Sequence, residues 1–195
     1  MQITFIRTSE RDYAIRCTCD DGAVLAVRTY DRPLGLPHDL AHYVVERELG
    51  LAWGFWGLVA AGATFTSVMR CVGRTRPHHR EEGQWLIKQH RDDLTEAEAL
   101  VGVLLDVWRG GTGAEAAYRA VVARCWRRTD ASPSREQVVR VYMALSQMET
   151  QWLSLDQGAT LTVDWPTTLG WRRRLRPVPR RWAPRVRRVT QRQGA

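Results

Sequence analysis

The sequence MQITFIRTSERDYAIRCTCDDGAVLAV, residues 1–27, decides the fold class because apolar and polar side chains alternate along it. Ile3 and Phe5 alternate with polar neighbours, and the run from Tyr13 to Cys19 repeats the pattern. Asp20-Asp21-Gly22 is typical of a turn into a third run, Val24 to Val27. The pattern predicts a three-stranded antiparallel meander.

A helix is predicted next, over residues 37–49. Pro37 suits the first position of a helix, and Gly50 is typical of the residue that ends one. The next 21 residues, 49–69, carry no charge, but their glycines, threonines and serine favour a buried helix or helical hairpin over a membrane span. We therefore expect no transmembrane segment.

The predicted helix 37–49 carries an unusual group of polar side chains. At about 100° per residue, His38, His42 and Glu46 fall on one face, and Asp39 lies beside Glu46. Two imidazoles one turn apart can bind one zinc ion or a similar divalent metal. The alternative is structural, with the histidines on a solvated edge and Glu46 paired with an arginine.

The run from His38 to His42 resembles the H-E-x-x-H helix of zinc metallopeptidases, with Asp39 in place of the glutamate base. The resemblance implies a divalent-metal site of hydrolase type, with Asp39 as the candidate catalytic base. Aspartate is one methylene shorter, which moves its carboxylate away from a metal-bound water. A third ligand is required, and Glu46, His78 and His79 are the candidates.

A second resemblance covers the stretch from Leu36 through Gly62, with LPHDLAHYVVERELGL followed by GFWG and AAGA. This stretch is similar to a small bacterial protein family for which we know no established activity. The resemblance implies that the helix and the Gly-Phe-Trp-Gly turn belong together. Trp53, Phe55 and Trp56 are expected to be core aromatics over that helix.

Three more helices and a late strand are predicted towards the C-terminus. A polar loop over 70–83 precedes them. Thr95 and Thr112, each followed by a glutamate three residues on, predict capping boxes, and Ser132-Pro133 predicts the start of the last helix. Apolar residues spaced alternately three and four positions apart form one seam along this helix: Val138, Val141, Leu145, Met148, Trp152 and Leu155. Residues 161–163 predict a strand that joins the N-terminal sheet.

These elements predict an α+β fold, in which an antiparallel sheet of three N-terminal strands and one late strand packs on a layer of about four to five helices. Residues 1–170 are expected to form one domain, and residues 171–195 a disordered tail. The four cysteines show no disulfide or zinc-ribbon spacing and are expected to be buried free thiols. Together with the absence of a signal sequence, they predict a soluble, cytoplasmic protein.

The net charge of +8 arises in the tail. None of the 21 acidic residues lies after Asp164, whereas ten arginines do, so the preceding residues carry a net charge of −2. An arginine-rich tail with two tryptophans is typical of a segment that binds nucleic acid or another polyanion. An acidic protein, an anionic membrane or no partner at all are the alternatives. The candidate polyanion-binding residues are Arg172, Arg173, Arg174, Arg180, Arg181, Arg187 and Arg188.

Overall fold

The computed structural model describes residues 1–30, 35–75, 77–124 and 132–166, and it confirms the α+β fold. Five strands form one antiparallel sheet in the order β4-β3-β2-β1-β5. The predicted meander forms β1 to β3, and the predicted late strand, β5, pairs with β1. The strands are β1 (Gln2–Arg7), β2 (Tyr13–Thr18), β3 (Val24–Val27), β4 (Val68–Val72) and β5 (Thr160–Asp164).

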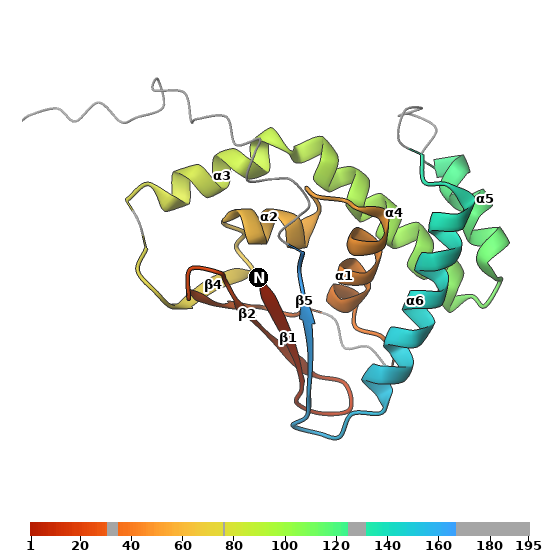
Figure 1. Cartoon of the computed structure of the whole chain (residues 1–195), viewed down its shortest axis with the longest axis horizontal. Helices are drawn as coiled ribbons and strands as arrows, with labels where there is room; N and C mark the ends of the chain where they lie inside the picture. Colours follow the sequence, from red (N-terminus) through yellow and green to blue (C-terminus); the bar gives the residue numbers. More distant parts are fainter. Residues whose placement is uncertain (31–34, 76, 125–131, 167–195) are drawn as a thin grey trace, which may run out of the picture.

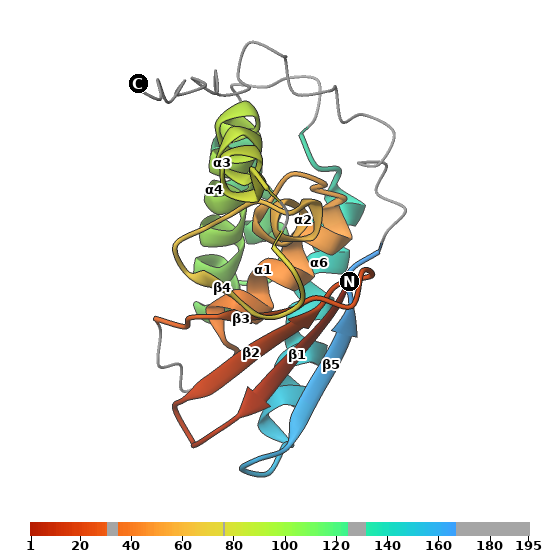
Figure 2. The same cartoon turned by 90° about the vertical axis from the view of Figure 1, so that its left-hand side faces the viewer.

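The helices gather over one face of this sheet (Figures 1 and 2). α1 packs against α2, α4 and α6, and α5 packs against α4 and α6. The helices are α1 (His38–Leu49), α2 (Phe55–Ala61), α3 (His79–Gln89), α4 (Arg91–Arg109), α5 (Ala114–Arg124) and α6 (Arg135–Leu153). α1 therefore lies between the sheet and the outer helices, so that most of its side chains are buried.

Alternation along the strands creates the core. In β1 and β2 the side chains of Ile3, Phe5 and Ile15 are buried beneath the helices. The alternate side chains face the open side of the sheet, where the hydroxyls of Thr4 and Thr162 hydrogen-bond at 3.2 Å. One apolar core therefore joins the inner face of the sheet to the helices.

The prediction was wrong between residues 64 and 90. Val68–Val72 was expected to belong to a buried apolar stretch and a polar loop, but it forms the edge strand β4. His78 and His79 were expected in the same loop, but α3 begins at His79, with His78 as its N-cap. Backbone pairing with β3, which local composition does not reveal, recruits Val68–Val72 into the sheet.

The two predicted threonine capping boxes were also wrong. Thr95 lies inside α4, where its hydroxyl donates to Arg91 O at 2.9 Å, because α4 begins at Arg91. The hydroxyl of Thr112 donates back to Val107 O at 3.3 Å instead of capping α5. The last helix does begin with a capping box, but Ser134 and Gln137 form it, two residues later than predicted.

The remaining helix predictions agree with the structure. α1 occupies His38–Leu49, and Gly50 ends it with a left-handed φ of 68°. In α6, Val138, Val141, Leu145 and Trp152 of the predicted seam are buried, while Met148 and Leu155 are partly buried against the core.

Among the described residues, no helix is long and apolar enough to cross a membrane. Of the described cysteines, all free, Cys17 is buried and Cys19 half-buried. Cys71 is exposed, contrary to expectation, because it lies on the edge strand β4. Cys125 and the tail lie outside the described residues.

Candidate functional site

Two polar side chains of α1 are sealed inside the protein. His42 is 4% exposed and Glu46 is fully buried, one turn apart on the same face as predicted. His42 Nδ1 lies 3.0 Å from Glu46 Oε1, and His42 Nε2 lies 3.3 Å from Glu98 Oε2 of α4. Both nitrogens of the imidazole therefore face a carboxylate, and the histidine connects α1 with α4.

The carboxylate of Glu46 also holds the start of α2. Its Oε1 accepts a hydrogen bond from Phe55 N at 2.8 Å, and its Oε2 accepts one from Trp56 N at 3.0 Å. These amides have no partner within their own helix, and the positive end of the helix dipole favours a negative charge there. A Cβ on Gly54 would lie 2.6 Å from Glu46 Oε2, so glycine is needed for this close approach.

The electrostatics favour a positive charge on His42. Burial alone lowers the pKa of His42, but hydrogen bonds and charge attraction from Glu46 and Glu98 outweigh it and raise the pKa to about 9. Burial raises the pKa of Glu46, while the hydrogen bond from His42 lowers the pKa of Glu98. With its pKa raised to about 9, the imidazole of His42 is protonated at neutral pH and lies between the side chains of Glu46 and Glu98. We call His42, Glu46 and Glu98 the His42 triad, of which His42 and Glu46 are buried and Glu98 is 51% exposed.

Asp39 and His38 lie next to the His42 triad. Asp39 Oδ2 accepts a hydrogen bond from Tyr13 OH at 2.6 Å, and Asp39 O accepts one from Trp56 Nε1 at 2.9 Å. Asp39, the predicted catalytic base, therefore ties α1 to β2 and to α2. His38 packs against His42, with ring centroids 4.7 Å apart.

The proposed metal ligands do not form a complete set in the structure. Among the described residues, no group of three or more histidines, cysteines or carboxylates is arranged to hold a metal ion. His78 and His79 belong to the start of α3, and His79 lines a separate cavity. The zinc site on α1 therefore stays a prediction. Glu98, which the sequence did not single out, contacts His42 directly.

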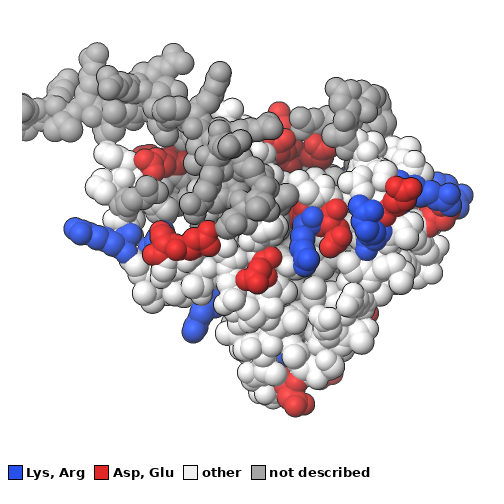
Figure 3. Space-filling model, in the orientation of Figure 1, with Lys and Arg blue, Asp and Glu red and all other residues white. Residues whose placement is uncertain are grey.

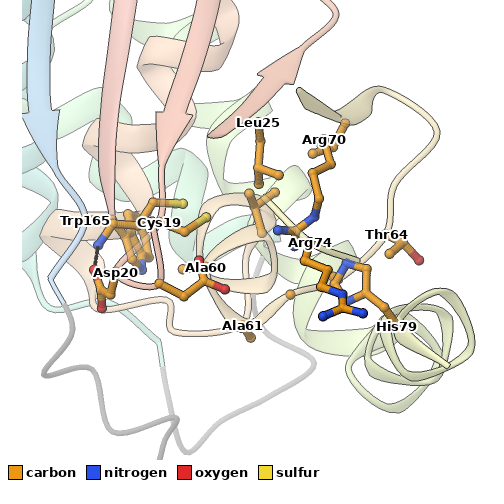
Figure 4. Close-up of a pocket in the computed structure, with 16 residues that line it drawn as sticks. Cys19, Asp20, Leu25, Ala60, Ala61, Thr64, Arg70, Arg74, His79 and Trp165 are labelled. Atoms are coloured by element: carbon orange, nitrogen blue, oxygen red, sulfur yellow. Dashed lines mark hydrogen bonds and ion pairs between the residues drawn. The ribbon is translucent and has the colours of Figure 1, made fainter. Parts of the chain in front are cut away.

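That separate cavity, of about 770 Å³, opens beside the C-terminal end of α2 (Figure 4). The apolar part of its wall comes from Leu25, Val59, Ala60, Ala61, Ala63, Val68 and Trp165. Its polar lining comes from the β2–β3 turn and from β4 and the residues that follow: Cys19, Asp20, Asp21, Arg70, Arg74 and His79. An apolar wall with a few charged groups is typical of small-molecule sites, and 770 Å³ is within their usual range of roughly 300–1,000 Å³.

Arg70 is the most informative residue of this cavity. It comes from β4 and is half-buried, and its Nε is buried without a hydrogen-bond partner. Among the described residues, neither the Arg70 side chain nor the Arg74 side chain makes a hydrogen bond or an ion pair. Arg70 lies close enough to Cys19 to lower the pKa of that thiol, although burial raises it more. A partly desolvated guanidinium without a counter-ion attracts a negatively charged group.

No sequence pattern indicated this cavity, because the strand that carries Arg70 was not predicted. The predicted polyanion-binding arginines, residues 172–188, lie outside the described residues. On the surface that Figure 3 shows, acidic and basic side chains of the described residues are interleaved. This mixture agrees with the small net charge of the residues that precede the tail.

Comparisons with known proteins identify no relative. No protein-family model, no curated protein sequence and no solved structure matches this chain. The two resemblances seen in the sequence are therefore untested, and the chemistry of the site rests on the geometry described above.

Proposed function

We propose that this protein binds a small organic anion, a carboxylate or a phosphate ester, in the cavity beside α2. The observation that supports this proposal is the half-buried guanidinium of Arg70, which lines the cavity and has no protein partner among the described residues. A guanidinium donates two parallel hydrogen bonds to a carboxylate or phosphate, which gives both affinity and orientation.

The neighbouring residues support the same ligand class. Arg74 and His79 line the cavity on the side of Arg70, so they add positive charge or hydrogen-bond donors to that end (Figure 4). Val59 and Ala63 of the apolar wall would cover the hydrocarbon part of the ligand. A fully solvated inorganic ion would leave this wall wet, so an organic anion fits better.

Ligand-observed NMR on the full chain tests the proposal, with phenyl phosphate and benzoate as anionic probes and benzyl alcohol as the uncharged analogue. We expect the anions to bind more tightly than the alcohol, and Arg70→Gln to weaken them by about tenfold or more, since a hydrogen bond to a charged group contributes roughly 1.5–3 kcal/mol. The relative response of the two anions distinguishes phosphate from carboxylate recognition.

Arg16→Gln is the matched control, because Arg16 is an exposed arginine of β2 and does not line the cavity. It should leave the binding of both anions unchanged. Equal binding by wild type and Arg70→Gln would overturn the proposal, as would binding of benzyl alcohol as tight as that of the anions. Thermal unfolding of each variant verifies that it is folded.

A further inference from the structure

The charges that line the cavity beside α2 are separated by sign. Arg70, Arg74 and His79 lie on one side, whereas Asp20 lies on the other (Figure 4). Asp21 follows Asp20 in the β2–β3 turn and also lines the cavity. The apolar wall occupies the space between, so the cavity has a cationic end, an apolar middle and an acidic end.

The acidic end already receives hydrogen-bond donors. Asp20 Oδ1 accepts a hydrogen bond from the N-terminal ammonium of Met1 at 2.9 Å, an ion pair that offsets the charge of Asp20 and leaves Asp21 as the uncompensated acid. Asp21 Oδ1 accepts one from Ala23 N at 3.1 Å. A carboxylate has about four acceptor positions, so the Asp21 side chain has capacity for a further donor from a ligand.

We infer that the ligand of this cavity is a zwitterion: an anionic group at Arg70, an apolar body along α2, and an ammonium group or similar donor at Asp21. This inference rests on the proposed function. An ammonium at Asp21 gains a charge-assisted hydrogen bond. A second anionic group there would meet the Asp21 carboxylate and be repelled. The acidic end therefore selects against dianions and in favour of amino-bearing anions.

Three probe series of matched chain length test the inference on the full chain by ligand-observed NMR. They are straight-chain ω-amino carboxylates, the carboxylates without the amine, and the dicarboxylates. For the chain length that spans the cavity, we expect the amino compound to bind about tenfold more tightly than the plain carboxylate, and the dicarboxylate to bind least. Asp21→Asn should remove the advantage of the amino compound and leave the plain carboxylate unchanged.

Asp156→Asn is the matched control, since Asp156 is exposed and does not line the cavity. It should leave the order of the three series intact. If plain carboxylates bind as tightly as amino carboxylates at every length, and Arg70→Gln weakens both, the inference fails and the proposed function stands. If Arg70→Gln weakens none of them, or if no probe binds, the proposed function fails as well.

Discussion

His42 shows how a single residue can hold several elements together. Its imidazole bridges Glu46, which caps α2, and Glu98, which belongs to α4. The spacing of His42 and Glu46 was readable from the sequence, because residues four apart share a helix face. The burial of these two side chains could not be read from the sequence, since it depends on α2 and α4 covering α1. The contacts of Glu46 with Gly54 and of His42 with Glu98 likewise depend on the tertiary fold.

The raised pKa of His42 predicts that the fold loses stability as the pH becomes alkaline. The pKa of His42 rises from an ordinary 6.5 to about 9 in the folded protein. A raised pKa of this kind stabilises the fold fully below about pH 6.5, and the contribution is lost as pH rises through about 9, where it has fallen by up to about 3 kcal/mol. Urea unfolding of wild type and His42→Gln gives the free energy of unfolding of each protein across this pH range. The contribution of His42 is the difference between the two dependences of this free energy on pH.

Titrating groups that do not contact His42 cancel in that difference, because both proteins retain them, whereas Glu46 and Glu98 contribute to it through their coupling to His42. A wild-type curve parallel to that of His42→Gln would contradict a charged His42. Elemental analysis of untagged protein tests the competing zinc prediction. About one equivalent of zinc that His42→Ala removes would make the residue a metal ligand instead.

Gly54 supplies a second prediction at the scale of one residue. A Cβ at this position would collide with the carboxylate of Glu46, so Gly54→Ala should displace the carboxylate from Phe55 N and Trp56 N. Leaving buried polar groups unsatisfied costs roughly 1–3 kcal/mol each, so we expect a loss of at least that size in the free energy of unfolding.

Gly102 is the matched control, since it lies inside α4 and a Cβ there would meet nothing within 4 Å. Gly102→Ala should stabilise the protein by roughly 0.5–1 kcal/mol, because alanine loses less backbone entropy in a helix. If the two substitutions have similar effects, the close approach of Glu46 to Gly54 does not exist.

At the scale of elements, segments with a clear apolar period were predictable, including the short edge strand β5, whereas the edge strand β4 was not. The seam of α6 extends over several turns, and its spacing alone identified Val141 and Leu145 as buried. β4 has five residues, only Val68 among them packs against the core, and pairing with β3 defines it. Because Arg70 is carried by this strand, the cavity was missed for the same reason.

The seam of α6 predicts a large effect at Leu145. This side chain is fully buried in the main core, so Leu145→Ala should lower the free energy of unfolding by roughly 2–5 kcal/mol through lost burial and a cavity. Met143 on the same helix is 64% exposed, and Met143→Ala should change the free energy of unfolding by less than about 0.5 kcal/mol. Chemical denaturation of both variants checks the contrast, and equal effects would contradict the orientation of α6.

At the scale of the whole molecule, charge is divided between the described body and the tail. Deleting residues 171–195 removes ten arginines and leaves a nearly neutral chain. We predict that the truncated protein folds but no longer binds single-stranded nucleic acid or anionic vesicles. Binding by the full chain should weaken steeply with added salt, because counter-ion release drives it. Electrophoretic shift and vesicle sedimentation measure both effects.

If the truncated chain still bound nucleic acid or anionic vesicles with full strength, the binding residues would lie in residues 1–170 and not in the tail. No binding by the full chain to either polyanion would leave the tail without this role. The cavity beside α2 provides an internal control, since it lies among the described residues. It should bind the probes of the proposed function equally well in the full chain and in the truncated protein.

The position of β1 inside the sheet has a consequence during protein synthesis. β1 pairs on one side with β2, which follows it at once, and on the other side with β5, where Gln2 faces Asp164. As the nascent chain leaves the ribosome, the outer edge of β1 therefore stays open until residues 160–164 emerge. A stalled or prematurely ended chain would expose an unpaired strand with an apolar inner face, which is a template for intermolecular association.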